Sequence, residues 1–296
     1  MRGSLNATRL APYILVAPFV VLFLAFGAYP IVQSLMLSTQ QTFGPGHARH
    51  VGLSNFRWLL EDPVFWQALR NTALFTAGSV CVQLPLSLGL AIILNRENLR
   101  GRALYRAVLF APSLVGVVFV GMLFSLVLEK RTGLLNRVLH GAFGFNLDFP
   151  WLFEHTMASL ILASLWMWVG FNMVYFLAAL QNVRKDLLEA AVIDGAGPFR
   201  RFVHVTVPAI LPVASFVTLL SVIGSFQLFE LPWIMITSLG AGHASRGVTL
   251  VMYLYQRGFE IGDLGYASAV GWVIAAVLVT AALAQRLVSR RAEELE

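Results

Sequence analysis

The sequence predicts an all-α, polytopic membrane protein with six transmembrane helices. Two features of the composition support this fold class. Hydrophobic residues make up 58% of the chain and charged residues only 12%, whereas soluble proteins carry about 25% charged residues. In addition, six segments each contain the roughly 20 largely apolar residues that a spanning helix needs. A chain of this composition has too little polar surface to fold as a water-soluble globule.

The six predicted spans follow one another along the chain and leave little length for a separate soluble domain. Four of them contain proline, which neighbouring helices and Ser or Thr side chains can accommodate within a bundle. The first is expected to be an uncleaved span, because its apolar core is longer than that of a signal peptide. The predicted spans are Pro12–Met36, Thr72–Leu94, Leu104–Leu128, Met157–Gln181, Pro208–Ile234 and Leu264–Gln285.

The distribution of Lys and Arg predicts the orientation in the membrane. With the N-terminus inside, the inner segments hold thirteen of the 21 basic residues, and the longer outer segments hold eight. Cytoplasmic loops carry the excess of positive charge in membrane proteins, so both termini are expected in the cytoplasm. The net charge of +6 is then distributed by side of the membrane and does not indicate a nucleic-acid-binding face.

The most informative segment lies between the fourth and fifth spans. Asp186 is expected to cap a helix of about two turns, with Glu189 closing a capping box, and Gly195 with Pro198 is expected to end it. Four apolar residues fall on one side of this helix. Such a ridge fits either a connector that rests on lipid headgroups or a helix that docks in a groove of a cytoplasmic partner. The four are Leu187, Leu188, Ala191 and Val192.

This segment resembles the EAA signature of ABC-transporter importer permeases, in the version found in the carbohydrate uptake class. Other stretches are similar to sugar permeases of the MalF/UgpA type, and the resemblance covers nearly the whole chain. The residues that carry the signature are Glu189-Ala190-Ala191, Asp194-Gly195-Ala196, Phe202, Pro208 and Pro212. The other stretches are Val51–Phe56, Asn71-Thr72 and Gly265–Ala269.

The resemblance implies a single transmembrane permease domain over residues 1–296, with the ABC type I importer permease fold, N-in and C-in. It also implies a multi-pass protein of the bacterial cytoplasmic (inner) membrane that translocates a sugar, oligosaccharide or related polyol. Residues 183–207 would form the cytoplasmic EAA coupling loop, which transmits closure of a separate ATPase to the spans. The coupling residues implied are Leu187, Glu189, Ala190, Ala191, Asp194, Gly195 and Ala196.

The same resemblance implies partner proteins in addition to membrane lipid. These are a second homologous permease subunit, a dimer of ATP-binding cassette subunits, and a periplasmic or lipid-anchored solute-binding protein. ATP and Mg²⁺ would be held by the partner ATPase, so no cofactor is expected in this chain. The sequence has no G-x-x-x-x-G-K-[ST] phosphate loop and no catalytic constellation, and the chain is therefore not expected to be an enzyme. Its single cysteine, Cys81, and the lack of a Cys/His cluster predict no metal site.

Polar residues inside the spans indicate where substrate could pass. Asn172 and Tyr175 are three residues apart and are expected to share a helix face, as are Gln227 and Glu230. With Trp166, they provide the amide, carboxylate and aromatic groups that bind neutral sugars. The alternative role for such groups is hydrogen bonding between helices, which holds the bundle together.

Two other functional classes remain open from the residues alone. A secondary transporter driven by an ion gradient would rely on an intramembrane carboxylate, for which Glu230 is the candidate. An ABC permease for amino acids or peptides is the other, although the Asp194-Gly195 pair resembles the carbohydrate class.

Overall fold

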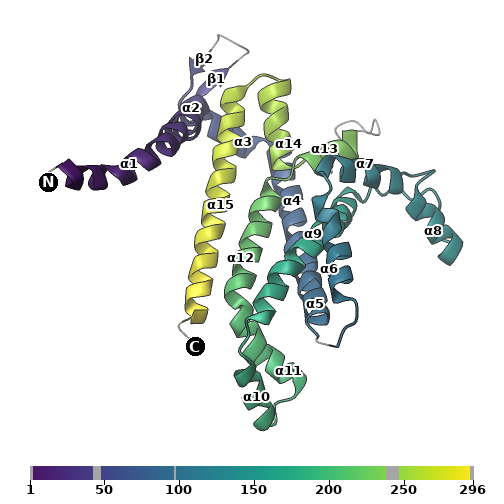
Figure 1. Cartoon of the computed structure of the whole chain (residues 1–296). Helices are drawn as coiled ribbons and strands as arrows, with labels where there is room; N and C mark the ends of the chain where they lie inside the picture. Colours follow the sequence, from purple (N-terminus) through teal and green to yellow (C-terminus); the bar gives the residue numbers. More distant parts are fainter. Residues whose placement is uncertain (1–2, 43–47, 97, 238–246, 294–296) are drawn as a thin grey trace. The chain divides into compact units, whose positions relative to one another are not determined.

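A computed structural model of the chain describes residues 3–42, 48–96, 98–237 and 247–293. The chain divides into two compact units. The first comprises Met1–Asp62 and Leu254–Val273, and the second comprises Pro63–Tyr253 and Ile274–Glu296. Both are built almost entirely from helices, so the predicted all-α class is confirmed (Figure 1).

The first unit contains the N-terminal helices and a short antiparallel hairpin, in which Gln40 pairs with His50 and Thr42 with Ala48. Its elements are α1 (Gly3–Phe23), the π turn η1 (Leu24–Ala28), α2 (Tyr29–Ser38), β1 (Gln40–Thr42), β2 (Ala48–His50), α3 (Ser54–Glu61) and the π turn η6 (Gln256–Glu260). Two helices belong to both units along the chain: α14 (Leu250–Tyr255) and α15 (Leu264–Glu293).

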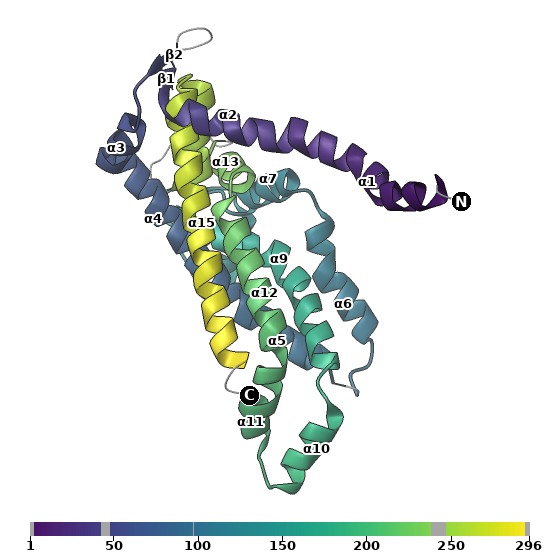
Figure 2. The same ribbon diagram turned by 90° about the vertical axis from the view of Figure 1, so that its left-hand side faces the viewer.

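The second unit holds most of the bundle. In Figures 1 and 2, α9 runs alongside α5, α6 and α12, and it contacts all three. The elements are α4 (Pro63–Gly78), the π turn η2 (Ser79–Gln83), α5 (Leu84–Leu94), α6 (Arg102–Phe110), the 3₁₀ turn η3 (Ala111–Leu114), α7 (Val117–Val127), α8 (Leu134–Phe143), α9 (Thr156–Gln181), α10 (Lys185–Ile193), α11 (Pro198–Arg201), the π turn η4 (Phe202–Thr206), α12 (Val207–Phe226) and α13 (Glu230–Thr237).

Within the described residues, five continuous helices are long and apolar enough to cross a membrane, and one bent pair could supply a sixth span. Four of the predicted spans are therefore confirmed as helices, with somewhat different ends, and two need correction. The five helices are Ala11–Ser38, Pro63–Leu94, Thr156–Gln181, Pro198–Phe226 and Leu264–Leu287.

The third predicted span, Leu104–Leu128, is not one straight helix. It consists of Arg102–Leu114 and Val117–Val127, which meet at an angle of 96°. Val115 and Gly116 have extended backbone, with ψ of 136° and 140°. Pro112 lies just before the bend and cannot donate a backbone hydrogen bond, which explains why the helix ends here.

The fifth predicted span, Pro208–Ile234, also consists of two helices. α12 ends at Phe226, and α13 begins only at Glu230. The Thr249 hydroxyl donates to the backbone oxygen of Leu228, at 2.7 Å, and thereby satisfies a carbonyl group at the break. The part beyond the break, α13, packs against α7.

Three of the long helices widen into a π turn shortly before a proline. η1, η2 and η4 end two residues before Pro30, Pro85 and Pro208, respectively. A proline ring clashes with the carbonyl group of the preceding turn, and a wider turn relieves that clash without breaking the helix. These three prolines are accommodated in long helices, as the sequence predicted, whereas Pro112 lies next to the bend.

Two of the stretches that carry the family resemblance have structural roles in the first unit. The Asn55 amide donates to the backbone oxygens of Ser38 and Gln40, at 2.8 Å each. Gly265 packs so closely on Gln40 that a Cβ atom there would overlap the Gln40 carbonyl oxygen. These residues therefore fix the hairpin against the start of α15.

Among the described residues, the core of the second unit includes two apolar clusters. The first joins α5, the C-terminal half of α9, and α12, and the second joins α4, α7, the N-terminal half of α9, and α13. Ser87 links α5 to α9, because its hydroxyl lies 2.9 Å from the backbone oxygen of Val169. The space between α4, α9 and α12 contains the cavity described below.

Candidate functional site

The N-terminus of α10 differs from the prediction. Arg184, with φ −61° and ψ 120°, occupies the N-cap position, and Asp186 lies within the first turn. No side chain caps this end, so the expected capping box with Glu189 does not form. Arg184 binds Asp186 instead, with 2.5 Å between Nη2 and Oδ2. The guanidinium group lowers the pKa of Asp186, which keeps a negative charge at the positive end of the helix dipole.

The C-terminus of α10 ends as predicted, and the geometry explains the glycine. Gly195 has a φ of +77°, a conformation that glycine adopts without strain. Its N–H donates to Val192 O at 3.0 Å, and the N–H of Ala196 donates to Ala191 O at 2.9 Å. These two bonds form a Schellman motif. Pro198 then begins α11, so the chain reverses within a few residues.

The predicted apolar ridge of α10 is only partly covered by the bundle. Leu188 packs against the first apolar cluster and, with Phe202 and Thr206, lines a small cavity of about 160 Å³. Leu187 is 46% exposed and Ile193 is 86% exposed. No residue of α10 is fully buried. The helix is thus attached on one side through Leu188, and its other side is open.

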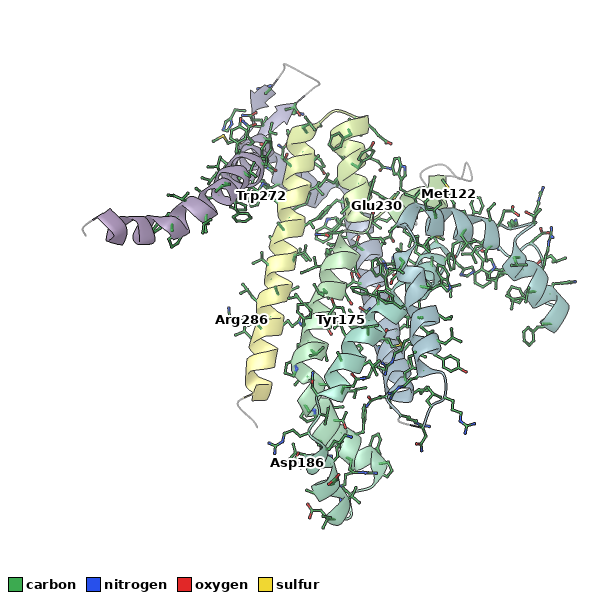
Figure 3. The ribbon with its side chains drawn as sticks, in the orientation of Figure 1. Met122, Tyr175, Asp186, Glu230, Trp272 and Arg286 are labelled. Carbon is green, nitrogen blue, oxygen red and sulfur yellow. The ribbon has the colours of Figure 1, made fainter. Side chains whose placement is uncertain are left out.

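The open side of α10 carries most of the residues expected to couple the chain to an ATPase. In Figures 1 and 2, α10 and α11 extend beyond the ends of α9 and α12, and Asp186 is labelled at that end in Figure 3. Ala191 and Ala196 are half-buried. The exposed members of the expected set are Leu187, Glu189, Ala190, Asp194 and Gly195.

A cavity of about 200 Å³ lies among α4, η2, α9 and α12. Each helix contributes residues at helical spacing, so that one stripe of each faces the same space. The continuous helix Pro63–Leu94 contributes Phe75, Ser79 and Gln83, and α9 contributes Ser164, Trp168, Phe171 and Asn172. The stripe on α12, with the residue after its end, comprises Leu220, Ser221, Gly224, Ser225 and Leu228.

The polar groups of this cavity are mostly not used for holding the helices together. The Ser164 hydroxyl donates to Oε1 of Gln83 at 3.4 Å, a long bond between α9 and η2. Asn172 is only 7% exposed, yet its side chain makes no hydrogen bond with the described part of the chain. A buried carboxamide without a protein partner is suited to bind a ligand or water. The lining also includes the aromatic rings of Phe75, Trp168 and Phe171.

The structure brings one of the five expected substrate-path residues, Asn172, into this cavity. Trp166 lies on another side of α9, where it is 38% exposed and packs against Phe124. Tyr175 is one turn from Asn172, but it packs against Phe171 and Phe216. Sharing a helix face was therefore not sufficient to place Tyr175 in the cavity lining.

Gln227 and Glu230 do not share a helix face, because the helix that should contain both is broken between them. Gln227 is the C-cap residue of α12, whereas Glu230 is the first residue of α13. Both side chains are exposed, and neither lines the cavity. Glu230, at the start of α13, is labelled in Figure 3.

The sequence contained a signal for the cavity residues that were missed. Ser79 and Gln83 are four residues apart in an apolar run, as are Ser221 and Ser225. In α9, Ser164 and Asn172 are eight apart, with Trp168 between them. Small polar residues repeated at intervals of four on three spans indicate three polar stripes. Which stripes face one another depends on how the helices pack.

The described residues include no group of three or more His, Cys, Asp or Glu side chains that could hold a metal ion.

Comparison with known proteins identifies the family. Residues 83–294, which include α9, α10 and α12, match the family described as binding-protein-dependent transport system inner membrane component. The chain belongs to this family. With its apolar helices, this permease is a multi-pass protein of the cytoplasmic (inner) membrane. The resemblance to ABC importer permeases drawn from the sequence is confirmed.

Curated relatives match this permease over nearly its whole length. It is 39% identical to the arabinooligosaccharides transport system permease protein AraP of Bacillus subtilis (strain 168), over 95% of this chain and 89% of the relative. It is 36% identical to the lactose transport system permease protein LacF of Rhizobium radiobacter, over 92% of this chain and 90% of the relative.

A solved structure confirms the fold of the permease. A chain of a bacterial ABC transporter involved in the import of the acidic polysaccharide alginate superposes with a TM-score of 0.78, covering 98% of this permease and 99% of that chain. The two sequences are 22% identical, so the likeness shows that this permease has the importer-permease fold.

Proposed function

We propose that this permease is the membrane subunit of an ATP-driven importer of a sugar, oligosaccharide or related polyol. Its family membership and its similarity to the AraP and LacF permeases support this function. In this proposal both termini and α10 lie in the cytoplasm. A solute-binding protein delivers substrate on the other side, and a second permease completes the path.

The observation that carries the proposal is the geometry of α10. The helix projects from the bundle, is held through Leu188, and leaves Glu189 and Ala190 open to a partner. A helix of this kind suits insertion into a groove, where small residues permit close approach and Glu189 can bind a donor. The ATPase with its ATP and Mg²⁺ would then be a separate subunit, and its closure would reach the spans through α10.

Leu188 provides the connection from α10 to the cavity. It packs on a cluster that includes Met173 of α9 and Val217 of α12, and both helices also line the cavity. A movement of α10 would therefore press directly on helices of the cavity. In the proposed cycle, this contact couples ATPase closure to a change in the cavity.

Isolation of the tagged permease from its native membranes tests the proposal. We expect an ATP-binding cassette subunit and a second permease to co-purify, and uptake into reconstituted vesicles to require ATP. Uptake that instead stops when a proton or sodium gradient is dissipated, with no ATPase in the sample, would favour an ion-coupled carrier. Uptake of amino acids or peptides would leave the importer intact and overturn the carbohydrate class.

Replacement of the buried carboxamide tests the role of the cavity. Asn172→Leu keeps a similar volume but removes the polar group that lies free in the cavity. We expect the rate of uptake to fall at least ten-fold. A ten-fold change corresponds to a free-energy difference of about 1.4 kcal/mol. The measurement is the initial rate of uptake at equal amounts of assembled complex. Gln181→Leu, the same chemical change at an exposed position on α9, is the control. Equal rates for both variants would remove the cavity from the substrate path.

A further inference from the structure

The polar groups that this permease contributes to the cavity are all uncharged. They are the hydroxyls of four serines and the carboxamides of Gln83 and Asn172. Hydroxyls and carboxamides both donate and accept, so they can match the hydroxyl groups of a sugar whichever way each one points. The serines are Ser79, Ser164, Ser221 and Ser225.

Aromatic rings line the same cavity beside these groups. Trp168 and Phe171 come from α9, and their rings pack edge-to-face with 5.6 Å between centroids. Phe75 comes from α4. A sugar ring has apolar C–H faces and a polar rim, so a cavity with both aromatic surface and neutral hydrogen-bonding groups complements it. The amide of Asn172 is available for polar contacts with a sugar, because its side chain has no hydrogen-bond partner within the described chain.

The volume of the cavity limits what can occupy it. Pockets for drug-sized ligands measure roughly 300–1,000 Å³. The cavity here, at about 200 Å³, is smaller. It suits one sugar ring at a time, so a longer saccharide would pass through it unit by unit.

From this lining we infer that the cavity selects a neutral sugar ring over an acidic one. The inference rests on the transport function proposed above and specifies its substrate class. A carboxylate that enters a small, largely apolar space loses its hydration, and neutral amides and hydroxyls compensate less well than a cation does. A neutral ring loses less hydration and regains its hydrogen bonds from the same groups. This permease would then differ in substrate charge from the alginate importer, whose fold it shares.

A cysteine placed in the cavity tests this inference without relying on transport. Cys81, the only cysteine in the chain, does not line the cavity, so Cys81→Ser with Ser221→Cys leaves a single thiol on the cavity wall. The rate at which N-ethylmaleimide alkylates that thiol is measured in the assembled complex. The probes are methyl glycosides of glucose, galactose and mannose, each compared with the form that carries a carboxylate at C6.

We expect at least one neutral glycoside to slow alkylation, about three-fold at twice its Kd, and its carboxylate form to leave the rate unchanged. The native chain, in which only Cys81 reacts, is the control and is expected to show no protection. Ser79→Cys in the same background is a second position if Ser221→Cys assembles poorly.

Each other outcome contradicts the inference. Equal protection by both forms would overturn charge selection, and protection by the carboxylate form alone would reverse it. An absence of protection, or a thiol that never reacts at either position, would mean that the cavity does not admit a sugar ring. Uptake by the same preparations is measured separately, so the inference can fail while the proposed importer function stands.

Discussion

Reversal of charge at Glu189 is expected to abolish uptake while leaving the permease in the membrane. Glu189 is exposed in the middle of α10, on the side that does not face the bundle. A lysine there would replace an acceptor with a cation at the proposed contact with the ATPase, and a charge buried against a mismatched partner costs several kcal/mol. We therefore expect Glu189→Lys to reduce uptake by at least two orders of magnitude. ATP hydrolysis should no longer respond to the loaded binding protein.

The control for this variant introduces the same side chain nearby. Gln181 is exposed at the end of α9, outside α10, and Gln181→Lys is expected to keep uptake close to that of the native permease. Both variants are compared at equal amounts in the membrane. Normal uptake by Glu189→Lys would contradict the assignment of α10 as the coupling helix, and an equal loss in both variants would point to a general effect of charge at this end.

An added methyl group at Gly170 is expected to have the largest effect on stability. A Cβ atom at this position of α9 would overlap the backbone oxygen of Leu109 in α6. Backbone cannot move aside as a flexible side chain can, so α6 would have to shift away from α9. We expect Gly170→Ala to lower the free energy of unfolding by about 3 kcal/mol, at the upper end of typical overpacking costs. The thermal unfolding midpoint of the purified permease should fall by about 6–12 °C.

Gly89 provides a matched control for that substitution. It lies in α5, and a Cβ atom there would meet no other atom within 4 Å. Gly89→Ala is expected to be neutral or to stabilise the helix by up to about 1 kcal/mol, because alanine has the higher helix propensity. If Gly170→Ala were as stable as Gly89→Ala, the close packing of α9 on α6 would not hold in the protein.

The spans could be predicted because a membrane helix is recognised from the length and composition of its own segment. The two breaks could not. The bend at Val115–Gly116 follows a proline and contains a glycine, but spanning helices tolerate both residues elsewhere in this chain. The break after Phe226 lies in an apolar run and is stabilised by Thr249, which is distant in sequence. The hydropathy of a segment indicates neither the bend nor the hydrogen bond from Thr249.

The candidate sites could be predicted only in part. The C-terminus of α10 could be predicted from Gly195, since a positive φ is a local property. The N-cap could not, because Arg184 binds Asp186 and the carboxylate does not cap the helix. In the spans, the residues that the sequence indicates for substrate binding are strongly polar or aromatic. The cavity depends instead on weakly polar residues such as Ser79 and Ser221, whose common location follows only from packing.

A cross-link from α10 tests most directly whether this helix couples the permease to an ATPase. Ile193 is 86% exposed at the end of α10, and a photoreactive benzoylphenylalanine can replace it in the native complex. Phe143, 81% exposed on α8, is the comparison position and is expected to lie on the other side of the membrane. The assignment of α10 as the coupling helix predicts that illumination joins position 193, but not position 143, to an ATP-binding cassette subunit. Cross-links from position 193 to lipid alone, or to an ATPase from position 143, would contradict it.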